Sequence, residues 1–216
     1  MKKKLLICLF IILGITVLAL VTPFIILGIR SNKINNDYKY LLLEDKLEVV
    51  KIEDVPLIKQ DISCGYAIID MLSSFYGARV SEEELYNNND GRITTSSTAG
   101  FVDEASKVLN KKCYAKKYLK NDELLLAINH SLASGNPVAI EWAAKLDGSW
   151  TLHWSVVTGM DEELIYVNNP YGYKEELTYD EFISRTTFKA FDHMPIGYQF
   201  GFAFGLFTKN TIIVIE

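Results

Sequence analysis

The chain has few of the residues from which metal and disulfide sites are built. Its 216 residues include three cysteines and three histidines, with no Cys-x-x-Cys pair and no His-Glu-x-x-His motif. The sequence therefore predicts neither a zinc site nor a disulfide scaffold. A glycine-rich phosphate-binding loop is also lacking, and we expect the protein to work without a cofactor.

Basic residues are also few relative to acidic ones. Residues 31–216 carry 18 basic and 27 acidic side chains, a formal charge of −9. Nucleic-acid binding requires a basic surface, so this class of partner is excluded. The acidic balance is compatible with cationic peptides, although net charge alone identifies no partner.

One long segment is without charge. The 25 residues Leu5–Ile29 would form a helix of about 37 Å, which exceeds a hydrocarbon core of about 30 Å. The absence of an Ala-x-Ala-like site favours an uncleaved single-pass anchor over a secretory signal. The basic segment Met1–Lys4 predicts an intracellular N-terminus, with the rest of the chain outside the cell membrane; Arg30, Lys33 and Lys39 oppose this orientation.

The remaining chain changes in character from helices to strands, which is typical of an α+β domain. We expect an anchor over 1–30, a polar linker over 31–46 and one domain over 47–216. Helical patterns follow one another up to residue 134. The expected extended segments are Leu47–Ile52, Val55–Ile58, Val138–Trp142, Thr151–Thr158, Leu164–Val167, Glu175–Leu177, Phe200–Phe207 and Thr211–Ile215.

The segment Gln60–Gly77 contains the most informative cysteine. Its apolar residues recur at steps of three and four, which predicts a buried helix face. Cys64 therefore lies at the first helical turn, where free N–H groups and the helix dipole favour an anion such as a thiolate. The alternative is a buried, inert cysteine. The residues of the apolar face are Ala67, Ile68, Met71, Leu72 and Phe75.

Of the three histidines, His153 is the candidate for a catalytic role. It lies in a predicted strand, and a neighbouring strand can bring a partner side chain to it. If that strand forms a hairpin with Leu164–Val167, the end of the second strand returns beside His153 and brings Asn168 or Asn169 to it. An amide there would fix the orientation of the imidazole. A structural role for this histidine is the alternative. Gln60 offers a side-chain N–H for a developing oxyanion.

These motifs together resemble a known family. The elements are Gln60, a Cys-Gly-x-Ala sequence beginning at Cys64, a His-x-x-Val-Val-x-Gly sequence beginning at His153, and an Asn-Pro pair beginning at Asn169. This order is similar to the papain-like cysteine peptidases, and in particular to the double-glycine leader peptidases that trim bacteriocin precursors. The resemblance covers about residues 50–190 and implies a papain-like fold.

The resemblance also implies residue roles and partners. Cys64 would be the nucleophile, His153 the general base and Asn169 the residue that orients it, while Gln60 would help to bind the oxyanion. Implied partners are a peptide or protein substrate and a transporter or secreted-peptide system. The departures are the short Gln60–Cys64 spacing, Ser63 and Asn169 where the family commonly has Asp, and a predicted orientation away from the cytosol, where leaders are cleaved.

Three hypotheses follow for function. The first is a membrane-anchored cysteine peptidase that forms an acyl-enzyme intermediate. The second is a non-catalytic binding module on a papain-like scaffold, which the short Gln60–Cys64 spacing favours. The third is a cell-wall peptide hydrolase, for which the Cys-Gly-Tyr-Ala sequence at Cys64 is less typical.

Overall fold

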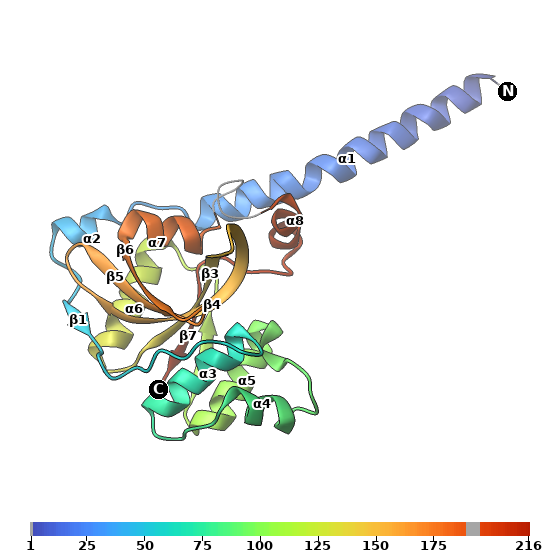
Figure 1. The fold of residues 1–216 in the computed structure, drawn as a ribbon. Helices are drawn as coiled ribbons and strands as arrows, with labels where there is room; N and C mark the ends of the chain where they lie inside the picture. Colours follow the sequence, from blue (N-terminus) through green and yellow to red (C-terminus); the bar gives the residue numbers. More distant parts are fainter. Residues whose placement is uncertain (1, 189–194) are drawn as a thin grey trace.

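The computed structural model describes residues 2–188 and 195–216. Helices dominate the first 133 residues and strands most of the rest (Figure 1). The helices are α1 (Lys2–Ile34), α2 (Lys39–Leu43), α3 (Cys64–Phe75), α4 (Glu82–Asn88), the 3-10 turn η1 (Thr94–Ser96), α5 (Thr98–Leu109), α6 (Asn121–Ala133), α7 (Tyr179–Thr186) and α8 (Ile196–Phe204). The strands are β1 (Val50–Lys51), β2 (Cys113–Lys116), β3 (Val138–Leu146), β4 (Ser149–Met160), β5 (Leu164–Asn169), β6 (Tyr173–Thr178) and β7 (Thr211–Ile215).

Most strands of the antiparallel sheet come from the C-terminal half of the domain. Its strand order is β2-β7-β3-β4-β5-β6, with β1 paired to β4. The hairpin β3–β4 turns at Asp147-Gly148, where both residues have positive φ, as a two-residue hairpin loop requires. The hairpin β4–β5 confirms the pairing expected from the sequence and pairs Val156 with Asn168. The end of β5 therefore returns toward the middle of β4.

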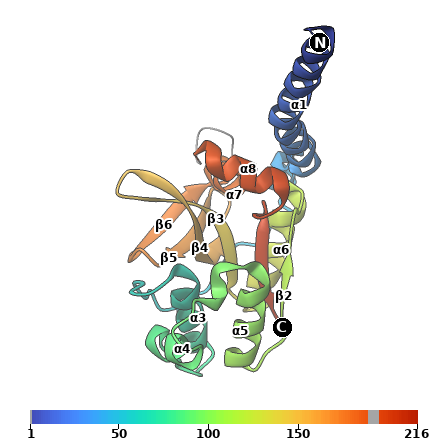
Figure 2. The ribbon, with the colours of Figure 1, turned by 90° about the vertical axis from the view of Figure 1, so that its right-hand side faces the viewer.

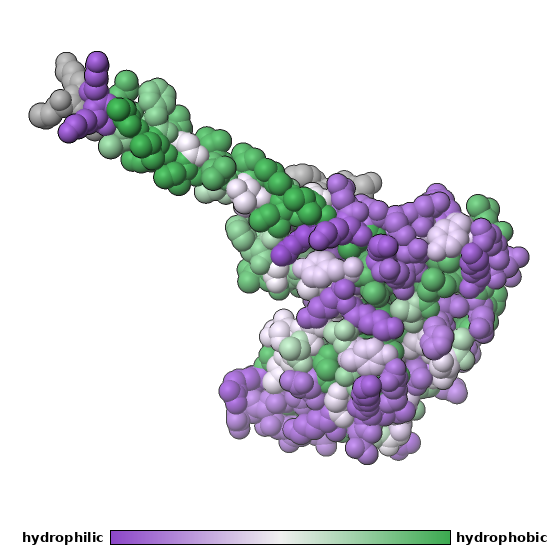
Figure 3. Space-filling view, turned by 180° about the vertical axis from the view of Figure 1, so that it is seen from behind, coloured by the Kyte–Doolittle hydropathy of each residue, from purple (hydrophilic) through white to green (hydrophobic). Residues whose placement is uncertain are grey.

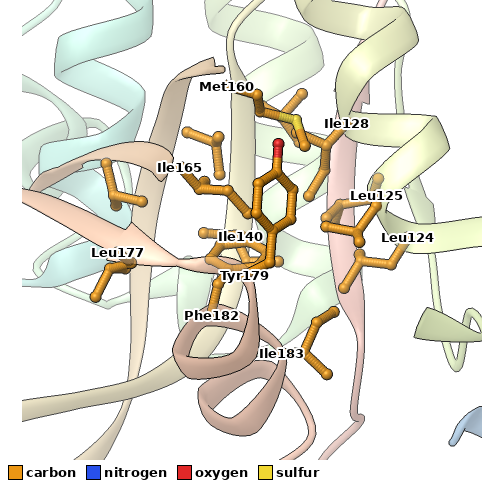
Figure 4. Packing of buried hydrophobic residues seen from close by; sticks show 14 of the residues in the cluster. Leu124, Leu125, Ile128, Ile140, Met160, Ile165, Leu177, Tyr179, Phe182 and Ile183 are labelled. Carbon is orange, nitrogen blue, oxygen red and sulfur yellow. The ribbon is translucent and has the colours of Figure 1, made fainter. Parts of the chain in front are cut away.

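Two hydrophobic clusters lie on opposite faces of this sheet. One joins α6 and α7 to the sheet and includes Phe182 and Ile128 (Figure 4). Trp142 belongs to the same cluster, and all three side chains are fully buried. The other joins α3 and α5 to the sheet through Phe101 and Trp154, whose ring centroids lie 4.6 Å apart. Figure 2 shows α3, α4 and α5 gathered at one end of the molecule, below the strands. The beginning of α3 thus lies against the sheet that carries β4 and β5.

Helix α1 is the one described helix long and apolar enough to cross a membrane. Most of it extends away from the domain, and its apolar side chains are exposed there (Figure 1). Its last turns pack on the domain, where Leu27 and Ile34 are buried. The boundary at residue 30 stays a prediction, but the expected linker over 31–46 contains the end of α1 and all of α2, and its residues Tyr38 and Leu41 are buried in the core.

One of the strand predictions was wrong. The segment Phe200–Phe207 lies mostly in α8, because Phe202 and Ala203 face the domain from a helix that ends at Gly205 in the left-handed conformation. Alternating phenylalanines in that segment imitate the two-residue period of a strand. In the region of Leu47–Ile52 and Val55–Ile58, only Val50–Lys51 pairs with the sheet.

Candidate active site

The chain around Cys64 is held in place by hydrogen bonds to its backbone. Ser63 caps α3, since its hydroxyl accepts a hydrogen bond from Tyr66 N at 3.2 Å. The buried carboxylate of Glu82, at the start of α4, accepts hydrogen bonds at 3.0 Å from the backbone N–H groups of the three residues before Cys64: Asp61, Ile62 and Ser63. These contacts fix the approach of the chain to the first turn of α3.

The residue after Cys64 must be glycine. A Cβ atom at Gly65 would lie 2.3 Å from Oγ1 and 2.4 Å from Cβ of the buried Thr95. Such a contact is sterically forbidden without movement of η1 or α3. The Cys-Gly pair thus allows α3 to pack closely on η1 while Cys64 keeps its place at the end of the helix.

His153 and Asn169 form a hydrogen bond whose direction is determined by their neighbours. Asn169 Oδ1 accepts from Tyr171 N at 2.9 Å, and its Nδ2 donates to Glu175 Oε1 at 2.7 Å. Since a backbone N–H can only donate and a carboxylate can only accept, the amide orientation is fixed. His153 Nε2, 3.1 Å from Oδ1, must therefore be the donor. In the neutral ring, this leaves Nδ1 without a proton.

Beyond Asn169, a buried ion pair continues the network. Glu175 on β6 pairs with Arg185 on α7, at 2.5 Å between Oε2 and Nη1, and Arg185 is almost completely buried. Arg185 Nε also donates to Ala143 O at 2.7 Å, and its guanidinium lies 3.6 Å from the centroid of the Trp142 ring. The orientation of Asn169 thus depends on a charge pair held by a different strand and helix.

The structure brings Cys64 close to this network. The backbone N–H of Trp154, the residue after His153, faces the Cys64 sulfur, as do the N–H groups of Cys64 and Gly65. Tyr171 stacks on the His153 ring with centroids 4.0 Å apart, and its hydroxyl bonds to Thr151 at 2.9 Å. No hydrogen bond joins Sγ to the His153 ring within the described residues. Catalytic hydrogen bonds are commonly long in a substrate-free enzyme and shorten on binding.

Burial determines the charge state of both groups. It raises the pKa of the half-buried Cys64 thiol, although the surrounding backbone N–H groups lower it. Burial also lowers the pKa of His153 to about 4. At neutral pH the structure therefore holds a neutral thiol and a neutral imidazole. The expected lowering of the thiol pKa by the helix N-terminus is present but is smaller than the effect of desolvation.

A third buried group lies on the same side of the sheet as Cys64. Glu141 on β3 pairs across the sheet with Trp154 and accepts a hydrogen bond from Thr208 Oγ1 at 3.1 Å. Burial raises the pKa of Glu141 to about 7, and its charge raises the pKa of the Cys64 thiol further.

These shifts predict an unusual pH dependence of stability. Between pH 4 and 6.5 the unfolded chain binds a proton at His153 that the folded chain does not, so acidification destabilises the fold. Between pH 4.5 and 7 the folded chain binds a proton at Glu141 that the unfolded chain does not, so acidification stabilises it. Where the two ranges overlap, from pH 4.5 to 6.5, the two contributions oppose each other and largely cancel.

We expect Glu141→Gln to reveal the contribution of His153. The free energy of unfolding of this variant should fall by about 2–3 kcal/mol between pH 6.5 and 4.5, whereas the wild-type value changes much less. Urea unfolding at several pH values measures the difference. The exposed Glu83→Gln serves as the matched control and should keep the wild-type profile. A profile of Glu141→Gln as flat as that of the wild type would contradict the assignment.

Gln60 lies beside the site but makes few contacts. Its backbone N–H donates to Pro170 O at 2.7 Å, which ties it to the residue that follows Asn169. Its Oε1 is buried without a hydrogen-bond partner in the described part of the chain. The four residues predicted from the sequence, Gln60, Cys64, His153 and Asn169, thus lie in one region of the molecule.

The remaining histidines, Cys113 and Asn168 are not described as part of this group of four. His130 is exposed on α6, and His193 lies outside the described residues. Cys113 is buried in the core. Asn168, the alternative partner of His153, instead donates to Val55 O at 3.0 Å. No group of three His, Cys, Asp or Glu residues in 2–188 and 195–216 is arranged to hold a metal ion.

Sequence reasoning missed four residues that contact the candidate site: Glu82, Tyr171, Glu175 and Arg185. Each acts through a contact between segments distant in the sequence, and each lies in an ordinary amphipathic or turn pattern. Tyr171 alone had a local signal, because it directly follows the Asn-Pro pair.

A helical lobe that begins with Cys64, packed on an antiparallel sheet that carries His153 and Asn169, defines an α+β fold of the C39 peptidase type. A family model described as the Peptidase_C39 like family matches residues 52–199. The chain therefore belongs to this family, and the resemblance to double-glycine peptidases is confirmed. Among curated proteins, none matches the chain.

Three solved structures align with most of the chain, and the first of them supports the fold. A double glycine motif protease from an AMS/PCAT transporter, solved in complex with a leader peptide, aligns with a TM-score of 0.51 at 15% identity, over 78% of this chain and 98% of that one. A C39-like peptidase from Bacillus anthracis aligns with a TM-score of 0.48 at 16% identity, over 78% and 98%. The peptidase domain of Streptococcus ComA, a bifunctional ABC transporter in quorum sensing, gives 0.49 at 16% identity, over 75% and 98%.

Proposed function

We propose that this protein is a membrane-anchored cysteine peptidase that hydrolyses peptide bonds with Cys64, His153 and Asn169. The observation that carries the proposal is the state of the His153 ring. Its Nε2–H is held by Asn169 Oδ1, and its Nδ1 is unprotonated and has no hydrogen-bond partner in the described chain. An imidazole oriented in this way, beside a cysteine at a helix N-terminus, is suited to act as a general base.

The reaction would begin from the neutral pair. As Sγ of Cys64 attacks the substrate carbonyl carbon, Nδ1 of His153 takes the thiol proton. The tetrahedral intermediate then expels the amine, which receives that proton, and an acyl thioester remains on Cys64. A water molecule, deprotonated by His153, hydrolyses the thioester and restores the thiol. Asn169 keeps the ring in the productive tautomer throughout.

Stabilisation of the oxyanion is assigned to two groups. The backbone N–H of Cys64, at the free end of α3, is the first donor. We assign the second to the side-chain amide of Gln60, which its backbone hydrogen bond to Pro170 O keeps near the His153 network. The side-chain amide of Gln60 carries the N–H groups that this role requires, and its Oε1 is buried without a hydrogen-bond partner in the described chain.

The anchor and the substrate complete the proposal. Helix α1 would cross the cell membrane once, with the basic N-terminus inside and the catalytic domain outside. The buried contacts of Leu27 and Ile34 support an uncleaved helix, since cleavage after Ile34 would remove both side chains and expose the hydrophobic surface that they cover. The substrate would be a peptide, as for the transporter protease solved with its leader peptide. An extracellular domain fits a secreted peptide better than a cytosolic precursor.

A second candidate function is a non-catalytic peptide-binding module. Two observations favour it: burial raises the pKa of Cys64, and no hydrogen bond joins the thiol to the imidazole. On this hypothesis His153 and Asn169 are structural, and Cys64 has the reactivity of an ordinary half-buried thiol.

Thiol labelling distinguishes the two functions. With iodoacetamide at pH 7, followed by mass mapping, we expect Cys64 to react at least about tenfold faster than Cys113. Since Cys113 is more buried, the matched control is His153→Ala, in which assisted deprotonation is lost and Cys64 should slow severalfold. An unchanged rate at Cys64 in His153→Ala would refute the peptidase and favour the binding module.

A further inference from the structure

Helix α8 and the turn that follows it carry apolar side chains that no other described part of the domain covers. The segment Ile196–Thr208 contains no charged residue. Phe202 and Ala203 are buried against the domain, but Phe204 is 61% exposed and Leu206 is 77% exposed. We call these two exposed side chains the α8 face. Two large apolar side chains this exposed next to each other are unfavourable in water.

The position of the α8 face is set by α1. Phe200 packs edge-on against Phe24 of α1, with ring centroids 5.5 Å apart. Arg30 donates to Phe202 O at 2.7 Å, and Leu27 is buried in the same cluster as Phe202. Helix α8 is therefore fixed beside α1 at the point where α1 leaves the domain (Figure 1).

The length of α1 places this contact at a membrane boundary. About 20 helical residues cross a hydrocarbon core, so a span that begins at Leu5 ends near Phe24. Phe24 is the residue that Phe200 contacts, and the first charge after the span is Arg30. In Figure 3 the hydrophobic surface of α1 continues onto the adjacent surface of the domain.

We propose that the α8 face inserts into the lipid interface beside α1, so that the domain contacts the membrane at two points and not by a single helix. The inference rests on the proposed anchor. Phenylalanine and leucine side chains are suited to the boundary between headgroups and acyl chains. Arg30 and Lys33, which follow the span, lie where anionic headgroups would be.

A second contact would fix the direction in which the active site faces. Leu152, the neighbour of His153 on β4, packs against the cluster that holds α8. Below the hydrophobic area that continues from α1, Figure 3 shows the molecule hollowed. The proposed catalytic residues would therefore be held at a constant short height above the bilayer, in reach of peptides that lie on or emerge from it.

Spin labels in the full-length chain test this contact. In a chain with Cys8→Ser, Cys64→Ser and Cys113→Ala, single cysteines are introduced as Leu206→Cys, Leu18→Cys and Leu43→Cys. The chain is reconstituted in phosphatidylcholine–phosphatidylglycerol vesicles. Collisions with oxygen, which concentrates in lipid, and with a water-soluble nickel chelate are then measured by electron paramagnetic resonance. Circular dichroism checks that each variant is folded.

The three positions separate the possible outcomes. Leu43, 84% exposed at the end of α2, is the water control, and Leu18, 70% exposed in α1, is the lipid control. We expect the label at 206 to resemble that at 18, with nickel collisions severalfold below those at 43. A water-exposed label at 206 beside a lipid-exposed label at 18 would overturn the α8 contact alone. A water-exposed label at 18 would overturn the anchor as well.

A label at 206 shielded from both reagents would indicate protein contact and overturn the lipid assignment. Because the experiment does not measure peptidase activity, its result does not bear on the proposed catalytic residues.

Discussion

Replacement of Cys64 by alanine is expected to abolish peptide hydrolysis, with kcat/KM reduced at least about 10³-fold. The loss follows from the proposed mechanism, because no acyl-enzyme can form without the thiol and no other cysteine of the domain is near the His153 ring. Turnover of a peptide library that includes Gly-Gly sequences, measured by mass spectrometry on the full-length protein in detergent, gives the result.

Two further variants sharpen the prediction. Cys113→Ala removes the other thiol of the domain and should leave kcat/KM within severalfold of the wild type, because Cys113 is a packing residue on β2. Cys64→Ala combined with His153→Ala should be no worse than Cys64→Ala alone, since the two groups act as one unit. Residual hydrolysis in Cys64→Ala near the wild-type rate would assign the activity to another site or a contaminant.

Replacement of Arg185 by methionine is expected to lower the free energy of unfolding by about 3–5 kcal/mol. Methionine can occupy the space against Trp142, but the Glu175 carboxylate is then left without its partner in a mostly buried position. The cost thus arises from the unpaired charge more than from the lost attraction. Urea or thermal unfolding of the full-length protein measures it.

The double variant separates charge from packing. Arg185→Met with Glu175→Gln has no unpaired charge, and the Gln oxygen can still accept the hydrogen bond of Asn169 Nδ2, so most of the lost stability should return. Lys39→Met, in an exposed ion pair with Asp180, is the control for loss of a surface charge and should cost less than about 1 kcal/mol. A double variant as unstable as Arg185→Met would mean that packing of the guanidinium dominates.

The sequence predicts those features of the site that have local signals. The apolar spacing after Cys64 placed the cysteine at the start of a helix, and the expected hairpin with Leu164–Val167 brought Asn168 or Asn169 beside His153. The sequence Ser81-Glu82-Glu83-Glu84 has the pattern of a capping box, and the structure contains that box at the start of α4.

Contacts between distant segments were not predictable in this way. Glu82 looks like an ordinary acid in the first turn of a helix, yet it binds the chain before Cys64. The pKa of Cys64 was misjudged because the helix end is visible in the sequence, whereas the desolvation by packed neighbours is a tertiary property. The strand expected in Phe200–Phe207 failed because alternating phenylalanines fit either period when both faces of an element are apolar.

The network from His153 to Arg185 has a consequence for the timing of activity. Cys64 is made early, but Asn169, Glu175 and Arg185 follow more than a hundred residues later. A chain still being synthesised would hold its thiol without an oriented base, because the ring of His153 has nothing to fix its tautomer until Asn169, Tyr171 and Glu175 are in place. On the proposed function, the order of residues along the polypeptide would thus leave the nascent protein inactive until the sheet has folded.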